Sequence, residues 1–257
     1  MLTDTHCHLD QVEDPEAAIA QACAAGVGRI VAVSEGPETI DRVMALARSH
    51  PGVVLAGIGL HPVPLASLSD EEADRALAAV ERLLPEADVL GEVGLDHKVA
   101  VTPEEKARQR TFLDRLFALA AAARKPANLH SRRAERAALE AATLFHRQTG
   151  LGAQMHWFTH SAKLVRIANE AGNYVSVGPS AIGSAEVARV VLAIAPELLL
   201  LETDTPVPIG RVPNSPARAA EVAREVARIK GWSLDELERR TEENFARFLF
   251  AKNVAWE

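Results

Sequence analysis

One local pattern repeats along the whole chain: a short apolar run of strand type, then an alanine-rich segment with helical spacing of its apolar residues. Ser69 with Glu72 and Thr102 with Glu105 have the spacing of capping boxes, which mark helix starts. We expect strands at 2–9, 29–34, 53–60, 89–95, 126–131, 151–158, 174–179 and 198–204. We expect helices at 15–25, 37–49, 70–84, 104–124, 134–148, 161–171, 184–195, 215–230 and 233–250.

This alternation predicts a parallel sheet, because each helix returns the chain to the edge of the sheet from which the next strand starts. Eight strand–helix units in 257 residues is the number found in the (β/α)8 barrel. We therefore expect an α/β fold, a (β/α)8 TIM barrel with an extra C-terminal helix, formed by residues 1–257 as a single domain. A doubly wound open sheet is the alternative, since the number of strands does not show whether the sheet closes.

Composition and charge limit the classes of function. A formal net charge of -7 argues against nonspecific nucleic-acid binding, although an enzyme with a local basic patch or metal ions could still act on nucleic acids. Cys7 and Cys23 are too few for a disulfide framework and suggest a reducing compartment. Asp4 and His6 come too early for a secretory leader, and no apolar stretch is long enough to span a bilayer. We expect a cytoplasmic protein without membrane contact.

Imidazoles and carboxylates gather at the ends of the expected strands, which in a (β/α)8 barrel meet on the face that carries the active site. His6 and His8 are one residue apart in the first strand, so their side chains point to the same side and can bind one metal ion. Cys7 points the opposite way, into the core. Other strand ends carry His61, Glu92, Asp96, His130, His156, Glu202 and Asp204. Residues scattered over the sequence would therefore meet in space.

This combination indicates a metal site. A lone histidine at a strand end is more often structural, but a lone buried carboxylate is costly unless it is paired, protonated or metal-bound. Nitrogen and oxygen ligands suit Zn²⁺, Mn²⁺, Co²⁺ or Fe²⁺. The expected ligands are His6, His8 and Asp204 for one ion, His130 and His156 for a second, and Glu92 shared by both. Such a pair of ions supports metal-assisted hydrolysis.

Residues beside the ligands have weaker signals. Trp157 alternates with His156 and is expected in the core, with a stacking surface for a nucleic-acid base as the alternative. Arg132, Arg133 and Arg136 follow the fifth strand, where arginines could bind a phosphate. Arg133 and Arg136 could equally lie on the exposed face of the next helix. The remaining histidines, expected at the surface, are His50, His97, His146 and His160.

The motifs resemble those of the TatD family of metal-dependent deoxyribonucleases, which are amidohydrolase-like metallohydrolase barrels. The matching segments, from residue 3 to about 250, are DTHCHLD, GIGLHP, GEVGLD, HSR, MHWF, ETDTP and NFARFL. The resemblance implies the ligand set given above, with Asp204 as general base, Asp204 and Glu92 as catalytic residues, and His61 and Arg132 at the substrate phosphate. It also implies 3′→5′ trimming of DNA, preferentially single-stranded, by two divalent ions (Zn²⁺, Mn²⁺, Mg²⁺ or Co²⁺), without an obligate protein partner.

Departures from the family pattern concern the substrate rim. His97 and Lys98 stand where the family usually has a tyrosine pair, and Arg133 replaces an aspartate. Trp157 stands in place of a cysteine. The segment 207–216 keeps few counterparts of the usual arginine-, glycine- and asparagine-containing turn. The metal ligands match the family fully, whereas the residues that would meet the substrate do not.

Two other classes of function compete with a nuclease. A related metallohydrolase would act on a small-molecule ester or amide, or on a D-aminoacyl-tRNA. Many small-molecule relatives bridge their metals with a carboxylated lysine at the fourth strand, but here that position is Glu92, and Lys98 lies beyond the strand. A barrel that binds metal without catalysis would have lost a ligand or the base, and none is lost.

Overall fold

The computed structural model describes residues 1–159 and 161–250. Eight parallel strands form one sheet in which each strand lies beside the next one in the sequence. They are β1 (Leu2–Cys7), β2 (Val27–Val33), β3 (Val54–Ile58), β4 (Val89–Asp96), β5 (Ala127–Arg132), β6 (Ala153–Met155), β7 (Tyr174–Val177) and β8 (Leu199–Leu201). The number and order of the strands confirm the repeat predicted from the sequence.

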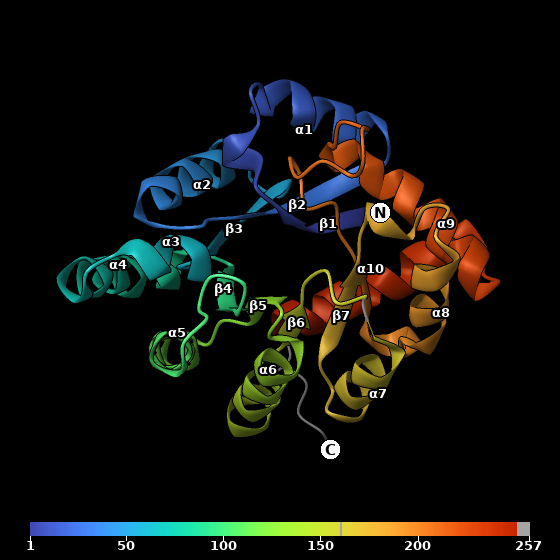
Figure 1. The fold of residues 1–257 in the computed structure, drawn as a ribbon. Helices are drawn as coiled ribbons and strands as arrows, with labels where there is room; N and C mark the ends of the chain where they lie inside the picture. Colours follow the sequence, from blue (N-terminus) through green and yellow to red (C-terminus); the bar gives the residue numbers. More distant parts are fainter. Residues whose placement is uncertain (160, 251–257) are drawn as a thin grey trace, which may run out of the picture.

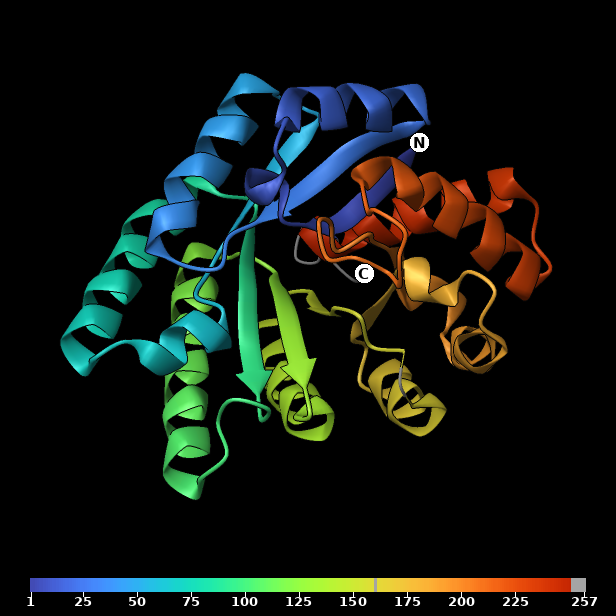
Figure 2. The same ribbon diagram turned by 45° about the horizontal axis from the view of Figure 1, so that its top comes forward.

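The strands curve into a nearly closed barrel, which excludes the doubly wound alternative (Figures 1 and 2). Separate hydrogen bonds join the first strand to the last one. The Thr5 hydroxyl donates to the Leu201 carbonyl at 2.9 Å, and the Asp204 N–H donates to the His6 carbonyl at 2.9 Å. The carboxyl ends of β1 and β8 therefore lie side by side, as a barrel requires.

Helices surround the barrel (Figure 1). They are α1 (Pro15–Ala24), α2 (Pro37–Ser49), α3 (Pro62–Ser67), α4 (Asp70–Leu83), α5 (Pro103–Ala123), α6 (Glu135–Thr149), α7 (Ala162–Glu170), α8 (Ala185–Ala193), α9 (Ala219–Lys230) and α10 (Leu234–Phe250). Both predicted capping boxes are present, at the starts of α4 and α5. The sequence did not predict α3, because six residues with two prolines are too short to show helical periodicity. In the described part of the chain, no helix has both the length and the apolarity to cross a membrane.

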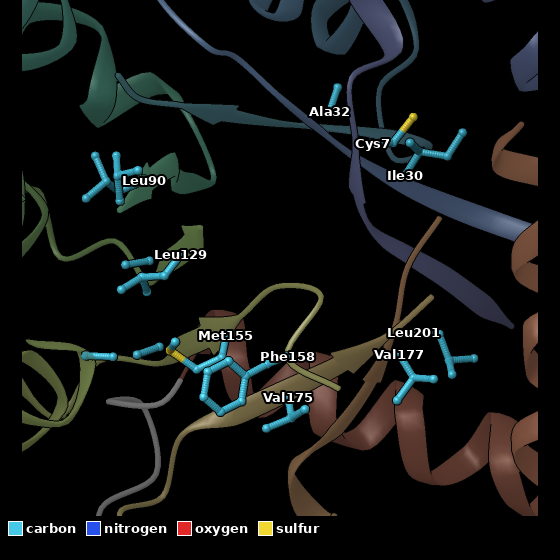
Figure 3. Close-up of a cluster of buried hydrophobic side chains, with 14 of the residues drawn as sticks. Cys7, Ile30, Ala32, Leu90, Leu129, Met155, Phe158, Val175, Val177 and Leu201 are labelled. Atoms are coloured by element: carbon cyan, nitrogen blue, oxygen red, sulfur yellow. The ribbon is translucent and has the colours of Figure 1, made fainter. Parts of the chain in front are cut away.

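The main hydrophobic core lies between the strands and the surrounding helices. Figure 3 shows Cys7 beside Ile30 and Ala32 of β2, and Val175 and Val177 of β7 in the same core. Cys7 is fully buried, as the alternation of β1 predicted. The same alternation directs the neighbouring histidines to the opposite side, into the barrel.

The extra C-terminal helix closes the amino-terminal end of the barrel. Phe245 and Phe248 of α10 are buried against Tyr174 and Leu200, near the starts of β7 and β8. Asn244 anchors the helix, because its side-chain amide donates to the Pro196 and Leu199 carbonyls, both at 2.8 Å. With this end sealed, the carboxyl ends of the strands are left as the accessible face of the barrel.

Candidate metal centre

The six side chains predicted to bind metal meet at the carboxyl ends of the strands. They are His6 in β1, His8 just after it, Glu92 in β4, His130 in β5, His156 just after β6 and Asp204 just after β8. All are buried except His130, which is partly exposed. Strand ends that are far apart in the sequence thus supply one compact, polar cluster inside an apolar barrel.

The first group surrounds one oxygen of Glu92. His6 Nε2 lies 3.5 Å from Glu92 Oε2 and 3.4 Å from Asp204 Oδ1. His8 Nε2 lies 3.4 Å from each of the same two oxygens. A tetrahedral ion with bonds of about 2.0–2.1 Å holds its ligand atoms roughly 3.4 Å apart. The spacing in this group therefore fits the coordination of one ion better than it fits direct hydrogen bonds.

The orientation of His6 supports the same conclusion. Asn128 donates from its amide nitrogen to the Thr5 carbonyl at 3.0 Å, so its oxygen faces His6 Nδ1, 2.9 Å away. In the neutral ring, His6 Nδ1 must then carry the proton and donate it, which leaves the lone pair of Nε2 directed at the site. That buried Nε2 has no hydrogen-bond partner among the described residues. A metal ion is the partner that such a nitrogen fits.

The second group surrounds the other oxygen of Glu92. His130 Nδ1 lies 3.0 Å from Glu92 Oε1, and His156 Nε2 lies 3.7 Å from it. The rings of His6 and His156 are stacked, with centroids 3.6 Å apart, so the two groups are in contact. Glu92 therefore lies between two sets of nitrogen donors and offers one oxygen to each.

His61 also faces Glu92, with Nε2 3.6 Å from Oε1, but its chemistry differs from that of the other histidines. Its Nδ1 accepts a hydrogen bond from the Val63 N–H at 3.2 Å, at the start of α3. Burial lowers the pKa of His61 to about 4, so the ring is neutral and its proton is on Nε2. His61 thus offers an N–H donor to the site rather than a lone pair for a metal.

Two further carboxylates orient the second group. Asp96 Oδ2 lies 3.1 Å from His130 Nε2, and Glu202 Oε2 lies 3.1 Å from His156 Nδ1. Glu202 is held in turn by the Ser176 hydroxyl at 2.6 Å. A carboxylate on the far nitrogen fixes the tautomer and the direction of a ligating imidazole. Both acids lie at strand ends, as predicted from the sequence, but their contacts with the histidines were not predicted.

Asn128 is not among the site residues predicted from the sequence. Alternation in β5 could have identified it, because it lies two residues before His130 and therefore on the same side of the strand. Its contact with His6 could not be foreseen in the same way, since it depends on how the barrel closes.

The ionised carboxylates of the cluster favour the binding of cations between its side chains. Burial alone would raise the pKa values of Glu92 and Asp204, but the surrounding histidines hold both below their usual ranges. Burial would lower the pKa of His130, but Asp96 and Glu92 raise it to about 9. The carboxylates thus stay ionised and attract cations, either protons on the imidazoles or divalent metal ions that replace them.

Five of the six side chains, all except His6, form the floor of a cavity of about 600 Å³. Arg132, for which the family resemblance implies a phosphate contact, lines its wall. Its Nε and one terminal nitrogen lie 2.8 and 2.7 Å from Asp96 Oδ2. Arg133 also lines the cavity, with an exposed side chain. Arg136 lies on α6 and pairs with Glu140 at 3.2 Å, which confirms the surface alternative for this residue.

Comparisons with known proteins show the family of the chain. The family model described as "TatD related DNase" matches residues 3–250. The chain belongs to the TatD family.

Human deoxyribonuclease TATDN3 is 32% identical to this TatD-family chain over 264 residues, which cover 98% of the chain and 95% of the human protein. YabD of Bacillus subtilis, an uncharacterized metal-dependent hydrolase, is 32% identical over 266 residues, which cover 98% of the chain and all of YabD. The crystal structure of YjjV, a TatD homologue from Escherichia coli, has a TM-score of 0.85 and 28% identity, with 99% of this chain and 98% of YjjV covered. The protein is thus a metal-dependent hydrolase with the TatD barrel.

Trp157 of this TatD-family protein is not a core residue, so the expectation drawn from strand alternation was wrong. β6 ends at Met155, and Trp157 has a left-handed backbone with φ of 46°. The backbone N–H of Trp157 donates to the Glu202 carboxylate at 2.8 Å, and the half-buried indole ring lines the cavity. Phe158 takes the core position instead. The stacking alternative is therefore the one that this geometry allows.

Of the histidines expected at the surface, the three within the described residues do not line the cavity of this TatD-family protein. His50, His97 and His146 are half-buried rather than exposed. His50 Nε2 lies 2.8 Å from a Glu16 carboxylate oxygen, and His146 Nδ1 lies 2.8 Å from the Leu151 carbonyl. These contacts are structural. His160 lies outside the described residues.

Proposed function

We propose that this TatD-family hydrolase removes nucleotides from the 3′ ends of DNA, preferentially single-stranded, and that residues 1–257 act as one catalytic domain. The position of Glu92 carries the proposal, because its two oxygens face two separate groups of nitrogen donors. Two ions about 3.5–4 Å apart are the arrangement of many nucleases and phosphatases. The identity with human deoxyribonuclease TATDN3 supports DNA as the substrate.

Two divalent ions, from among Zn²⁺, Mn²⁺, Mg²⁺ and Co²⁺, would supply Lewis-acid activation of water and neutralise negative charge on the phosphate. The residues that would hold them are His6, His8 and Asp204 for one ion, His130 and His156 for the other, and Glu92 for both. Asn128, Asp96 and Glu202 would keep three of the imidazoles in the required tautomer.

Asp204 is the general base in this proposal. Its carboxylate is ionised, since the facing histidines offset the effect of burial and hold its pKa below the usual range. It lies at the cavity floor, where a water molecule that attacks the phosphorus can pass its proton to a carboxylate oxygen. Glu92 keeps the two groups of ligands together and is therefore also required for catalysis.

Two side chains in the cavity wall would bind the phosphate. His61 presents its Nε2–H, because its Nδ1 already accepts from Val63. Arg132 is held by Asp96 through Nε and one terminal nitrogen, so the other N–H groups of its guanidinium remain for a phosphate oxygen. These donors would fix the scissile phosphate above the ligands.

The test is digestion of single-stranded DNA labelled at its 5′ end, by protein reconstituted in parallel with Mg²⁺, Mn²⁺, Co²⁺ and Zn²⁺. We expect a ladder that shortens from the 3′ end, and no ladder with the Asp204→Asn or Glu92→Gln protein. Lack of cleavage by wild-type protein that demonstrably holds metal would overturn the DNA assignment. Deacylation of D-aminoacyl-tRNA and hydrolysis of small esters would then be the activities to assay.

A further inference from the structure

One carboxylate in the cavity has no part in the proposed mechanism. Glu35 follows β2 and lines the wall beside His8 and His61. The backbone of Glu35 is held from both sides. Its N–H donates to the Thr39 hydroxyl oxygen at 2.9 Å, and its carbonyl accepts from the backbone N–H of His61 at 2.8 Å. Glu35 is therefore fixed next to a donor that would bind the substrate phosphate.

The walls of the cavity differ in charge. The two arginines that line it are Arg132, the last residue of β5, and Arg133, which follows it. β5 is three strands away from β2 in the order of the barrel. Glu135 also lies on that side, and its carboxylate accepts a hydrogen bond from the backbone N–H of Arg133 at 3.2 Å. Among the described residues, 1–159 and 161–250, no lysine or arginine lines the cavity beside Glu35. Within the same residues, the Glu35 carboxylate forms no ion pair. The cavity thus has a basic wall and an acidic wall, with the candidate ligands between them.

The surface beyond Glu35 is also acidic. Glu35 is shared with a neighbouring groove between the start of α2 and helices α3 and α4. Glu38 and Glu72 line this groove, together with one cation, Arg75. A nucleic-acid strand that continued past Glu35 would carry its phosphates along these carboxylates and be repelled. A strand that arrives over the arginines is therefore favoured only if it ends at Glu35.

We propose that Glu35 selects free 3′ ends, by accepting a hydrogen bond from the terminal 3′-hydroxyl and repelling a phosphate at the same position. This inference rests on the proposed nuclease function. A hydroxyl that donates to a carboxylate makes a charge-assisted hydrogen bond. A 3′-phosphate brings at least one negative charge beside the carboxylate in a partly buried cavity, where repulsion is weakly screened. Glu35 would be a specificity-determining residue rather than a catalytic one.

Three substrates test this proposal: a 5′-labelled single strand with a 3′-hydroxyl, the same strand with a 3′-phosphate, and a circular single strand. We expect wild-type protein to cleave the 3′-hydroxyl strand at least about tenfold faster (kcat/KM) than the 3′-phosphate strand, a difference of about 1.4 kcal/mol, and to leave the circle intact. In Glu35→Gln the preference should fall to about threefold or less, through faster cleavage of the 3′-phosphate strand, because the amide oxygen still accepts from the hydroxyl but carries no charge.

Glu81→Gln is the matched control, since Glu81 is exposed on α4, lines neither the cavity nor the neighbouring groove, and should leave the preference unchanged. Equal preferences in wild type and Glu35→Gln would overturn the role of Glu35 while the nuclease function stands. Equal rates on both linear strands would do the same without relying on a variant. Cleavage of the circle at the rate of the linear strand would overturn the role of Glu35 and also the trimming from 3′ ends proposed above. Metal-loaded wild type that cleaves no DNA would overturn the proposed function and this inference together.

Discussion

The side-chain oxygen of Asn128 lies 2.9 Å from His6 Nδ1 and determines which nitrogen of His6 faces the candidate metal centre. Asn128 belongs to β5 and His6 to β1, so the contact spans the interior of the barrel. The orientation of the amide follows from its donation to the Thr5 carbonyl at 3.0 Å. Because the ligand and its orienting residue come from distant strands, the barrel must form before this nitrogen is directed correctly.

Asn128→Ala should weaken metal binding. The substitution removes the acceptor for the His6 Nδ1–H, so the ring loses its fixed tautomer and direction. Loss of such a partner typically lowers metal affinity by about 10–100-fold. Competition with a chromophoric chelator measures the affinity. Asn173→Ala is the control, because Asn173 is buried and bonded to Thr143 at 2.8 Å away from the cavity. A folded Asn128→Ala protein with wild-type affinity would contradict the role of Asn128.

Glu202→Gln should affect the second group of ligands more than the first. Glu202 accepts from Ser176 and from the Trp157 N–H, and its Oε2 lies 3.1 Å from His156 Nδ1. A glutamine keeps the size of the side chain, but an NH2 group replaces one carboxylate oxygen. This group donates hydrogen bonds, so one of the three partners, which donate to Glu202, loses its acceptor. We expect the number of bound ions at limiting metal concentration to fall from two to one. The number of bound ions per chain is measured as metal content after dialysis against a buffer with a fixed free-metal concentration. Two ions retained at wild-type affinity would argue that Glu202 does not orient the second group of ligands.

Chelation should destabilise the protein. Glu92 and Asp204 are buried, and without an ion their charges are balanced only by protonated histidines. An ion at 100 times its dissociation constant contributes about 2.7 kcal/mol to the free energy of unfolding. For a chain of this length that corresponds to about 5–10 °C in Tm. Calorimetry with and without EDTA checks this, and added metal should restore the Tm. Glu92→Gln should lose most of the response, and an equal response would contradict the assigned site.

Arg132→Gln should weaken substrate binding. Arg132 lines the cavity and keeps free N–H groups beside the candidate ligands, and a hydrogen bond to a charged group is worth about 1.5–3 kcal/mol. We therefore expect KM for DNA to rise at least about tenfold and the salt dependence of binding to become shallower. Steady-state kinetics at several salt concentrations measure both effects. Arg136→Gln, on α6 outside the cavity, should change neither. If both variants behave alike, Arg132 makes no specific phosphate contact.

Local rules predicted the parts of this molecule that depend on neighbours in the sequence. Strand alternation separated Cys7, in the core, from His6 and His8, in the site, and the repeat predicted eight parallel strands. The same alternation failed at Trp157, because β6 stops at Met155 and the backbone turns before the tryptophan. The rule therefore held within strands and at His8, one residue beyond β1, and failed at Trp157, two residues beyond the end of β6.

Side-chain contacts between different strands could not be predicted. Nothing in the order of residues indicated that Asp96 would hold both His130 and Arg132, or that Glu202 would hold His156. These pairings depend on the register between strands and on closure of the barrel, which no local pattern contains. The convergence of the predicted ligands was foreseeable from topology alone, whereas the residues that orient them required coordinates.

Gly94→Ala should destabilise the fold at the site itself. Gly94 in β4 pairs with His130 in β5, has a φ of 148°, and would place a Cβ 2.1 Å from the His130 carbonyl oxygen. A residue forced into such a backbone conformation costs about 1–3 kcal/mol, and relief of the clash would move His130 away from Glu92. We expect a lower free energy of unfolding in urea together with weaker metal binding. Gly36→Ala is the control, since Gly36 has an extended φ of -175° and nothing within 4 Å of the added Cβ. Unfolding of the two variants at the same urea concentration would show that the close approach of β4 and β5 does not require glycine.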